Sequence, residues 1–445
     1  MELKGQTIAI LGAARSGLSA ARLARQLGGR PVVFDSGDPA KLAGDVAKLK
    51  AESIDFVQGL DGAQKAAVAG TFHLVVTSPG IDATWPLPRI FTDRGVPLVG
   101  EIEFAWRVLR PTPVAAITGT NGKTTTTELL ERMFNHCGRK TIACGNYGLP
   151  LCEVAIRGEK YDVLTVEVSS FQLETITSFQ PKVALWLNFA ADHLDRYPDM
   201  ESYFAAKHRI FDYMTPEDTA VVRAGESLGT IKPKTVTFTT ESGINADYTL
   251  REKAIFHHGV SVAAVADLPL QELHNIENQM AALATGRTFG LEFSDMIHGL
   301  QGYEPARHRC EMVREHRGHA YYNDSKATNL HAVESCLRSQ AAPVVLIAGG
   351  KEKGIDYTPF RPLFQEKITA LVTIGEIAGK LRDLFSDIVP CQTAANIPEA
   401  VRLATDMARP GQAIVLSPGT SSFDMFSGGY AERGNAFRDA VLALE

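Results

Sequence analysis

A glycine-rich turn with a lysine and adjacent threonines is the strongest chemical signal in the chain. Val114 to Ile117 form an apolar run that predicts a buried strand. GTNGKTT follows at residues 119–125, and a helical pattern begins at once. A glycine turn between a strand and a helix lets backbone N–H groups and the helix N-terminus face an oligophosphate. Lys123 would add a positive charge for the terminal phosphates, and Thr124 would add a hydroxyl ligand for Mg²⁺.

This turn departs from the general phosphate-binding pattern. Only two residues, Thr120 and Asn121, separate its first glycine from the Gly-Lys pair, whereas the general pattern has four. A glycine–lysine turn that binds no ligand is the alternative interpretation. The strand before the turn and the helix after it favour the phosphate site.

Side chains of the kinds that bind metal ions lie in or after two further expected strands. Glu167 lies in the apolar run 162–170, where a buried carboxylate requires a partner. We expect that partner to be the Mg²⁺ held by Thr124, with a structural ion pair as the alternative. The segment after the strand expected in 182–190 carries Asp192, His193, Asp195, Lys207 and His208. This group suggests a second metal position, and a purely structural histidine is the alternative.

The N-terminal residues are close to a dinucleotide-binding turn. Residues 12–17 read GAARSG between two expected strands, with Ala14 where the second glycine should stand. Asp35 ends the next strand, where an acidic residue could hold a ribose hydroxyl. A tight turn with a surface aspartate fits equally well. Another strand runs into a loop at Ser78, so a nucleotide-type ligand is compatible with this edge and a redox cofactor is not required.

Amide and polar loop residues complete the candidate set. Asn275 and Asn278 are spaced i, i+3 on an expected helix and could bind a nucleotide base or ribose, or Asn275 could cap the helix. Three polar loops follow expected strands near the C-terminus: YYNDSKATN (321–329), GGKEKG (349–354) and LSPGTSSFDMF (416–426). Each alone would pass for a solvated loop. Together, at equivalent strand ends, they indicate one shared ligand site.

The composition limits the class of protein. With 445 residues the chain is too long for one ordinary core, so we expect two or three domains. Strand-like and helical runs alternate, which predicts an α/β fold of parallel sheets covered by helices, with a polar, helical second half in the middle domain. The net charge of −6 gives no footprint for nucleic acid or an anionic membrane. No apolar run is long enough for a membrane span, and the N-terminus enters a strand without a leader pattern.

Cysteine use is typical of a reducing compartment. The six cysteines are scattered and include no CxxC pair. We therefore expect free thiols, a cytoplasmic location and no structural zinc site.

Several motifs together resemble those of the Mur ligases. The matching segments, in family order, are GTNGKTT, EVSSFQLE, NFAADHLDRYPDMESYFAAKHRIF, HNIENQMAA, NDSKATN and LSPGTSSFDMF. The resemblance extends from about Gly12 to Arg433. It implies a Rossmann-like domain for a UDP substrate at 1–101, a central P-loop-type ATPase domain at 102–306, and a C-terminal Rossmann-like amino-acid-binding domain at 307–445.

Within this family, SSFQLE, DHLDRY and NDSKATN favour the member that adds D-glutamate to UDP-N-acetylmuramoyl-L-alanine in peptidoglycan synthesis. The resemblance implies ATP and two Mg²⁺ positions, with the substrate carboxylate attacking the γ-phosphate and the amine then displacing phosphate from the acyl phosphate. We expect a monomer. The closest alternative is a folylpolyglutamate synthase or a Mur ligase of another step. A nucleotide-binding regulatory protein is the alternative from another class.

The resemblance also implies roles for individual residues. Lys123, His193 and a carbamylated Lys207 would be catalytic. The metal ligands would be Thr124, Glu167, His193 and Lys207. ATP would contact Gly119, Thr120, Asn121, Gly122, Lys123, Thr124, Thr125, Asn275, Asn278, Arg309 and Asp324. The UDP substrate would contact Arg15, Ser16, Asp35, Ser78 and Asn146. D-Glutamate would contact Lys326, Thr328, Lys353 and Ser422, whereas we expect Lys351 to be a solvated charge and assign no aromatic contact beyond the candidate Tyr430.

Overall fold

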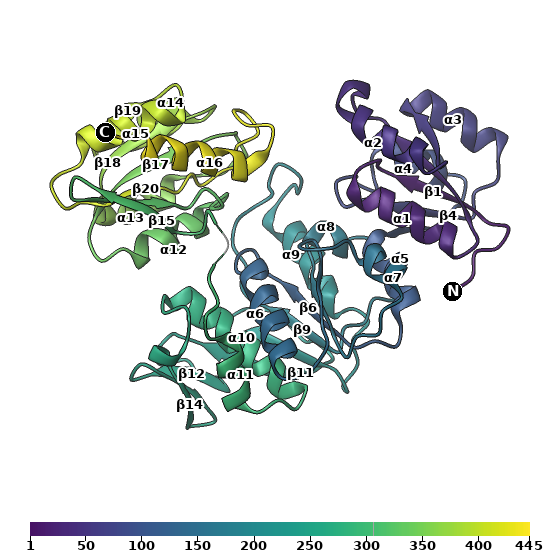
Figure 1. Ribbon diagram of the computed structural model, residues 1–445, viewed down its shortest axis with the longest axis horizontal. Helices are drawn as coiled ribbons and strands as arrows, with labels where there is room; N and C mark the ends of the chain where they lie inside the picture. The colour runs from purple at the N-terminus through teal and green to yellow at the C-terminus, as the bar shows by residue number, and fades with distance from the viewer. Residues whose placement is uncertain (306) are drawn as a thin grey trace. The chain divides into compact units, whose positions relative to one another are not determined.

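The computed structural model describes residues 1–305 and 307–445, and its fold is α/β with three sheets (Figure 1). The chain falls into two compact units. The first unit comprises Met1–Asn188, Phe204–Gln271 and Asn275–Gln301, and the second comprises Phe189–Tyr203, Glu272–His274 and Gly302–Glu445. The first unit contains two of the sheets and the second unit contains the third.

The first sheet is five-stranded and parallel, in the order β3-β2-β1-β4-β5. Its strands are β1 (Thr7–Leu11), β2 (Arg30–Asp35), β3 (Asp55–Gln58), β4 (Leu74–Thr77) and β5 (Leu98–Gly100). Its helices are α1 (Arg15–Gln26), α2 (Pro39–Ala51), α3 (Gly59–Ala69), α4 (Pro86–Thr92) and α5 (Glu101–Leu109). Apolar residues of β1 and β2 pack against α3 and α4, where the rings of Phe34 and Phe91 meet edge to face. The strands expected on either side of residues 12–17, and the strand that runs into the loop at Ser78, are confirmed.

The second sheet has nine strands in the order β14-β13-β12-β11-β10-β9-β6-β8-β7. The strands are β6 (Val114–Thr118), β7 (Ala143–Gly145), β8 (Leu164–Glu167), β9 (Val183–Trp186), β10 (Thr219–Arg223), β11 (Lys234–Thr239), β12 (Tyr248–Arg251), β13 (Ala254–His257) and β14 (Val260–Ala264). The helices are α6 (Lys123–His136), α7 (Leu151–Arg157), α8 (Ser170–Leu173), α9 (Met200–His208), α10 (Leu273–Thr288) and α11 (Phe293–Leu300), with 3₁₀ turns η1 (Arg209–Phe211) and η2 (Val265–Asp267). Strand β6 lies between β8 and β9 and is parallel to both.

The prediction of a polar, helical second half in this region is wrong. Strands β10 to β14 occupy much of it, and β12, β13 and β14 pair antiparallel at the edge of the sheet. These edge strands are short and only partly buried, and most of β14 is exposed or half-buried. They therefore lack the continuous apolar runs by which a buried parallel strand is recognised.

The third sheet has six strands in the order β15-β16-β20-β17-β18-β19. Its strands are β15 (Glu311–His316), β16 (His319–Asn323), β17 (Val344–Gly349), β18 (Ile368–Ile374), β19 (Cys391–Thr393) and β20 (Ile414–Leu416). Its helices are α12 (Leu330–Ser339), α13 (Arg361–Lys367), α14 (Ala378–Phe385), α15 (Ile397–Met407) and α16 (Gly429–Leu442), with a 3₁₀ turn η3 (Thr358–Phe360). One apolar core lies against α12, α13 and α14, and another against α15 and α16, so the sheet is the middle of three layers.

Among the described strands of the third sheet, β15 alone runs antiparallel to its neighbour. Strands β16, β20 and β17 are parallel neighbours, so their carboxyl ends meet at one edge. The three sheets fall within the predicted segments 1–101, 102–306 and 307–445, whose boundaries stay a prediction. Among the described helices, none is long and apolar enough to cross a membrane.

Candidate active site

The turn between β6 and α6 is held in shape by its glycines and by Asn188. Gly119 and Gly122 have φ values of +150° and +82°, which side-chain-bearing residues rarely adopt. The N–H groups of Thr120 and Asn121 donate to the backbone and side-chain oxygens of Asn188, at 3.0 and 2.9 Å. Sequence reasoning missed Asn188, which ties the turn to the segment after β9.

Lys123 begins α6 and its ammonium lies over the turn. Its Nζ donates to the carbonyls of Gly119 and Thr120, at 2.8 and 2.9 Å. Thr124 follows in the first helical turn and is buried. The predicted strand, turn and helix are confirmed, with the lysine and the hydroxyl at the helix N-terminus, where the helix dipole favours an anion.

Helix α10 packs directly on this turn through Asn278. A Cβ atom on Gly122 would lie 2.3 Å from Oδ1 of Asn278, so only glycine allows this approach. The amide of Asn278 donates to Oδ1 of Asn275 at 3.3 Å. Because α10 begins at Leu273, Asn275 lies inside the helix rather than before it, which argues against the capping interpretation. The two amides therefore form a pair, and that of Asn278 adjoins the turn.

Glu167 ends β8 beside the turn and is 2% exposed. Its Oε1 accepts a hydrogen bond of 2.7 Å from the amide of Asn146, whose own N–H donates to the Glu167 carbonyl at 2.9 Å. Its Oε2 is buried and has no hydrogen-bond partner among the described residues. Leaving a buried carboxylate oxygen unpaired is costly, and a cation ligand position explains it. The donor set of Thr124 and Glu167 thus fits Mg²⁺, which prefers hard oxygen ligands.

Lys207 and His208 are the last two residues of α9, and their side chains make different contacts. Lys207 is 2% exposed, and its Nζ donates to the carbonyl of Gly119 at 3.0 Å, so the turn also accepts this second lysine. A ring nitrogen of His208 contacts the carbonyl of Leu228 at 3.0 Å, and the ring packs against Phe211. His208 is therefore structural, which is the alternative considered for a histidine in this segment.

The turn between β1 and α1 is built by close contacts. A Cβ atom on Gly17 would lie 1.8 Å from the carbonyl oxygen of Gly12, and one on Gly12 would lie 2.6 Å from Oγ of Ser78. Asp35 accepts backbone N–H bonds from Ala13 and Gly37, at 2.9 and 2.8 Å. The carboxylate therefore shapes the turn, as in the alternative interpretation. The Ser78 hydroxyl is buried without a hydrogen-bond partner in the described residues.

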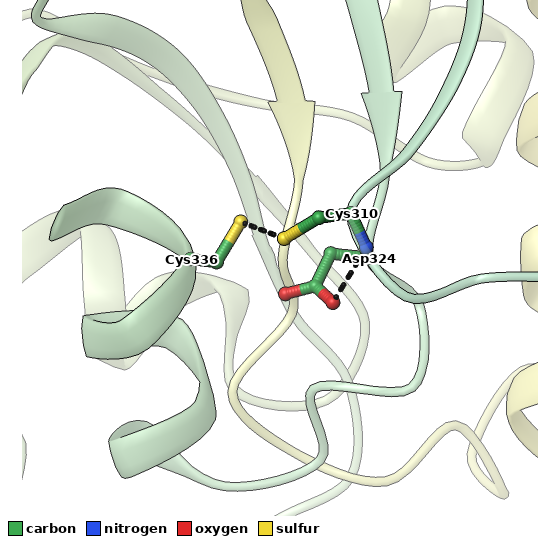
Figure 2. Close-up of side chains that lie close together, drawn as sticks. All are labelled: Cys310, Asp324 and Cys336. Carbon is green, nitrogen blue, oxygen red and sulfur yellow. Dashed lines mark hydrogen bonds between the residues drawn. The ribbon is translucent and has the colours of Figure 1, made fainter. Parts of the chain in front are cut away.

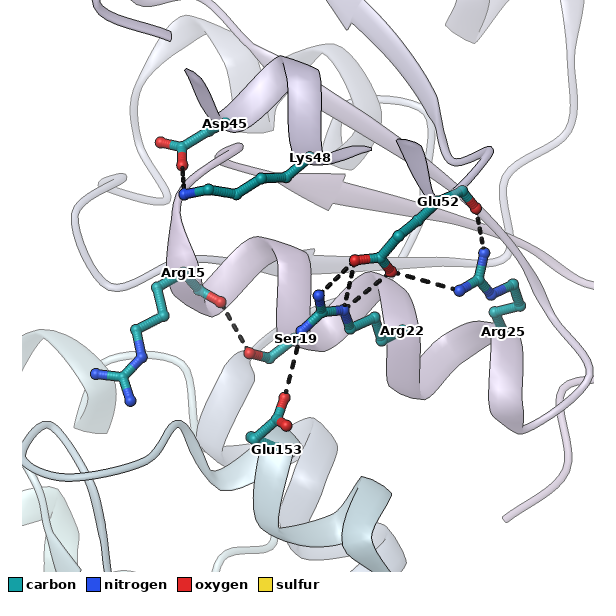
Figure 3. Close-up of polar contacts among 8 residues, drawn as sticks. All are labelled: Arg15, Ser19, Arg22, Arg25, Asp45, Lys48, Glu52 and Glu153. Carbon is teal, nitrogen blue, oxygen red and sulfur yellow. Dashed lines mark hydrogen bonds and ion pairs between the residues drawn. The ribbon is translucent and has the colours of Figure 1, made fainter. Parts of the chain in front are cut away.

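The charged residues of α1 divide into two groups. Figure 3 shows the side chain of Arg15 pointing away from the ion pairs that Arg22 and Arg25 make with Glu52. Arg15 is exposed and Ser16 is half-buried. These two predicted UDP-substrate residues thus present their side chains at the N-terminus of α1, where a phosphate would be favoured.

The three polar loops of the third sheet leave the neighbouring strands β16, β20 and β17, as predicted. Buried Arg433 on α16 ties them together. Its guanidinium donates to the carbonyls of Ser325 at 2.9 Å, Thr420 at 3.1 Å and Gly349 at 3.4 Å. Burial lowers the pKa of Arg433 to about 10. Sequence reasoning missed this arginine, because nothing near it in the chain marks its partners.

Lys353 lies in a buried polar cluster of the second unit. Its Nζ donates to Oδ1 of Asp192 at 3.1 Å and to the carbonyl of Thr328 at 3.2 Å. The amide of Asn329 donates to the other Asp192 oxygen at 3.0 Å. The backbone N–H of His193 also donates to Asp192, at 2.8 Å, while Asp195 is exposed. The segment predicted to gather metal ligands therefore places Asp192 in an ion pair.

The remaining predicted amino-acid-binding residues lie on the same loops. The ammonium of Lys326 lies 5.2 Å from the ring centroid of Tyr430, a cation–π distance. The Ser422 hydroxyl is buried and has no hydrogen-bond partner within the described part of the chain. Lys351 is exposed, as expected for a solvated charge.

The predicted nucleotide residues of the second unit are largely buried. Oδ1 of Asp324 accepts the N–H of Cys310 at 3.2 Å, and Oδ2 accepts the Ser417 hydroxyl at 2.7 Å. Burial raises the pKa of Asp324 to about 6, against the effect of these bonds. Nε of Arg309 is buried without a hydrogen-bond partner among the described residues, so it can still bind an acceptor.

Comparison with known proteins identifies the family to which this chain belongs. Residues 117–286 match the Mur ligase middle domain, and residues 308–419 match the Mur ligase glutamate ligase domain. The UDP-N-acetylmuramoylalanine–D-glutamate ligase of Trichlorobacter lovleyi is 40% identical over 452 residues, covering 100% of each chain. The protein of that name from Pelobacter propionicus is 38% identical over 455 residues, again covering 100% of each.

Solved structures show the same fold at low sequence identity. UDP-N-acetylmuramate-alanine ligase MurC of Thermotoga maritima superimposes with a TM-score of 0.62 at 16% identity, covering 98% of this chain and 99% of that one. The MurF ligase of Thermotoga maritima, solved in complex with ADP, gives a TM-score of 0.58 at 13% identity, covering 93% and 95%. The resemblance noted in the motifs is thereby confirmed along the whole chain, and the chain belongs to the Mur ligase family, the ATP-dependent ligases of peptidoglycan synthesis.

Proposed function

We propose that this Mur ligase joins D-glutamate to UDP-N-acetylmuramoyl-L-alanine at the expense of ATP. The substrate pair is taken from the names of the full-length relatives. The observation that best supports phosphoryl transfer is Glu167, whose buried Oε2 lies without a hydrogen-bond partner among the described residues.

The first step activates the substrate carboxylate. A carboxylate oxygen attacks the γ-phosphorus of ATP, an O–P bond forms, and the bond to the β-phosphate oxygen breaks to release ADP. Lys123 exchanges its two carbonyl contacts for the phosphate oxygens and stabilises the charge that develops on them. Thr124 and Glu167 would hold Mg²⁺, which supplies charge neutralisation at the phosphates when bound.

Lys207 has a separate proposed role. Its neutral amine would attack CO₂ and lose one proton, which gives an anionic carbamate suited to a hard cation. The carbamate nitrogen keeps one N–H, so the hydrogen bond to the Gly119 carbonyl can persist. A second Mg²⁺ position at this lysine, and the catalytic role of His193, stay predictions.

The second step forms the amide. The neutral amine of D-glutamate attacks the acyl carbon, and phosphate leaves from the tetrahedral intermediate. Since the amine must be free, the two carboxylates are the groups available for binding, and Lys326, Lys353, Thr328 and Ser422 offer donors for them. Lys353 is paired with Asp192, so an incoming carboxylate would compete with that aspartate for the ammonium.

Other contacts are proposed from position. Arg15, Ser16, Asp35, Ser78 and Asn146 would bind the UDP substrate. Asn275, Asn278, Arg309 and Asp324 would bind the adenine nucleotide. We further propose a monomer that acts in the cytoplasm.

The test is a substrate panel read by ADP release. UDP-muramoyl substrates with and without L-alanine are combined with D-glutamate, L-glutamate, L-lysine, D-alanine and folate-type acceptors. We expect release only with UDP-N-acetylmuramoyl-L-alanine plus D-glutamate. Release with another pair would assign another step of the pathway or a folylpolyglutamate synthase. ATP binding without release under any combination would indicate a regulatory protein instead.

A further inference from the structure

Two cysteines of the second unit face each other beside Asp324. Figure 2 shows Cys310, which precedes β15, and Cys336 on α12 pointing toward one another. Their sulfur atoms lie 3.0 Å apart, and one ligand atom from each of Cys310, Cys336 and Asp324 lies within 4.8 Å of the other two. Neither thiol has a role in the ligase chemistry described above.

The contacts favour sulfur–sulfur chemistry over a metal site. Both carboxylate oxygens of Asp324 already accept hydrogen bonds, from the Cys310 N–H and the Ser417 hydroxyl. Among the residues that the structure describes, three ligands converge, whereas structural zinc takes four. The sulfur atoms need to approach by only about 1 Å to reach a disulfide bond length.

We propose that Cys310 and Cys336 are a site of reversible oxidation to an intramolecular disulfide, with a small-molecule disulfide as the oxidant. Cys310 is half-buried and Cys336 is 2% exposed, so Cys310 reacts first. With a small disulfide RSSR, the Cys310 thiolate attacks one sulfur, the S–S bond breaks, and RSH leaves. The Cys336 thiolate then attacks the Cys310 sulfur and releases the second RSH. The balance is two protein thiols plus RSSR giving one protein disulfide plus two RSH.

Proton removal sets the speed of this reaction. The hydrogen bond with Cys310 and burial hold the pKa of Cys336 well above its ordinary value. The pKa of Cys310 is also raised by burial, although its contact with Cys336 opposes this. Because the thiolate is the attacking species, oxidation accelerates as the pH rises. The Asp324 carboxylate, which has an oxygen within 4.8 Å of both sulfur atoms, can accept a proton.

The disulfide would act on nucleotide binding through Asp324, a consequence that rests on the proposed function. Drawing the two sulfurs together moves the Cys310 backbone, whose N–H holds Oδ1 of Asp324 at 3.2 Å. We therefore expect the oxidised protein to bind ATP more weakly.

The experiment treats the full-length protein with oxidised glutathione, measures the intact mass before any alkylation, and then alkylates the remaining thiols for peptide mapping. We expect a loss of about 2 Da, which is two hydrogen atoms, a Cys310–Cys336 linkage in peptide maps, and full reversal by dithiothreitol. Cys391→Ala, a half-buried thiol of the same unit, should react like the wild type, and Cys336→Ala should stop at the glutathione adduct on Cys310. The ATP dissociation constant should rise about tenfold on oxidation, equivalent to about 1.4 kcal/mol.

Several results would overturn the proposal. Linkage of other cysteines, no linkage at all, or an adduct that persists in the wild type would each refute the disulfide site. One bound zinc per chain that protects the two thiols would replace it with a metal site. An unchanged ATP affinity in the linked protein would refute the coupling to Asp324. Failure to bind ATP in any state would refute the proposed function and leave the linkage result intact.

Discussion

The first unit contains two glycine turns of the same type that differ in the contacts of a nearby carboxylate. Each joins a parallel strand to a helix, one from β1 to α1 and the other from β6 to α6. In the first turn, Asp35 from the next strand accepts two backbone N–H groups and satisfies its own charge locally. In the second, Glu167 from the neighbouring strand β8 leaves Oε2 without a hydrogen-bond partner among the described residues.

The two turns also differ in the first residue of the helix that follows each of them. The β1 turn begins its helix with exposed Arg15, whose side chain points outward (Figure 3). The β6 turn begins its helix with Lys123, held over the turn by two carbonyls. A strand, a glycine turn and a helix thus create a place that favours an anion, and the β6 turn adds the inward cation and the carboxylate that the proposed phosphoryl transfer needs.

The largest expected effect comes from removing the inward cation. Lys123→Ala should lower the rate of ADP formation by a factor on the order of 10²–10³, because it deletes a preorganised charge at the phosphates. The matched change in the other turn, Arg15→Ala, should leave ADP formation at saturating substrate nearly unchanged and raise the KM of the UDP substrate. Steady-state kinetics and thermal melting of both variants decide this. Equal rates in folded Lys123→Ala and the wild type would remove the distinction between the turns.

A smaller effect is expected from the lysines of the third sheet. Lys353→Ala should raise the KM for D-glutamate about 10- to 100-fold, the value of one charge-assisted hydrogen bond. Lys351→Ala, two residues away and exposed, is the control and should change nothing. If Lys353→Ala also keeps wild-type D-glutamate kinetics, the amino acid binds elsewhere. These two variants extend the comparison to the loop after β17, in which no helix begins directly at the glycines and lysines.

Glycine replacement at the two ends of α6 tests the contact with α10. Gly122→Ala should destabilise the protein by about 1–2 kcal/mol more than Gly138→Ala, since the first adds a clash to the strain of positive φ. A Cβ atom at Gly122 would lie 2.3 Å from Oδ1 of Asn278, whereas one at Gly138 would meet nothing within 4 Å. Urea unfolding measures the difference. Equal losses for the two variants would show that Asn278 yields readily and does not fix the turn.

The sequence predicted the positions of some of these residues and missed others. Lys123, Thr124 and Glu167 were predictable because a local pattern of strand, turn and helix sets their positions. Arg433 was not, because it lies 108 residues from Ser325 and most of its acceptors are backbone carbonyls, which any residue carries. The same holds for the contact of Cys310 with Cys336, 26 residues apart. The hairpin strands β12–β14 escaped prediction because short edge strands need little apolar sequence.

The pH dependence of the free energy of unfolding should report on a contact between the region that carries the β1 turn and the region that carries the β6 turn. Glu101, at the start of α5, is buried and accepts the N–H of Cys152 on α7 at 2.6 Å. Burial raises the pKa of Glu101 to about 7 from 4.5. The folded state therefore binds this proton more tightly than the unfolded state, and its contribution is present at low pH and lost as the pH rises toward 7.

We expect the free energy of unfolding to fall between pH 5 and pH 7 by about 1 kcal/mol per pH unit from this group. Glu101→Gln should remove that slope, and chemical unfolding at several pH values measures it. The same slope in the variant would assign the pH dependence to other carboxyl groups.

The central claim is that the β6 turn transfers a phosphoryl group to the substrate carboxylate. The most direct measurement uses UDP-N-acetylmuramoyl-L-alanine with ¹⁸O in its carboxylate, together with ATP and D-glutamate. If an acyl phosphate forms, one labelled oxygen per turnover should appear in the inorganic phosphate, because the C–O bond to that oxygen breaks when the amine attacks. Inorganic phosphate free of label, with amide product formed, would contradict the account.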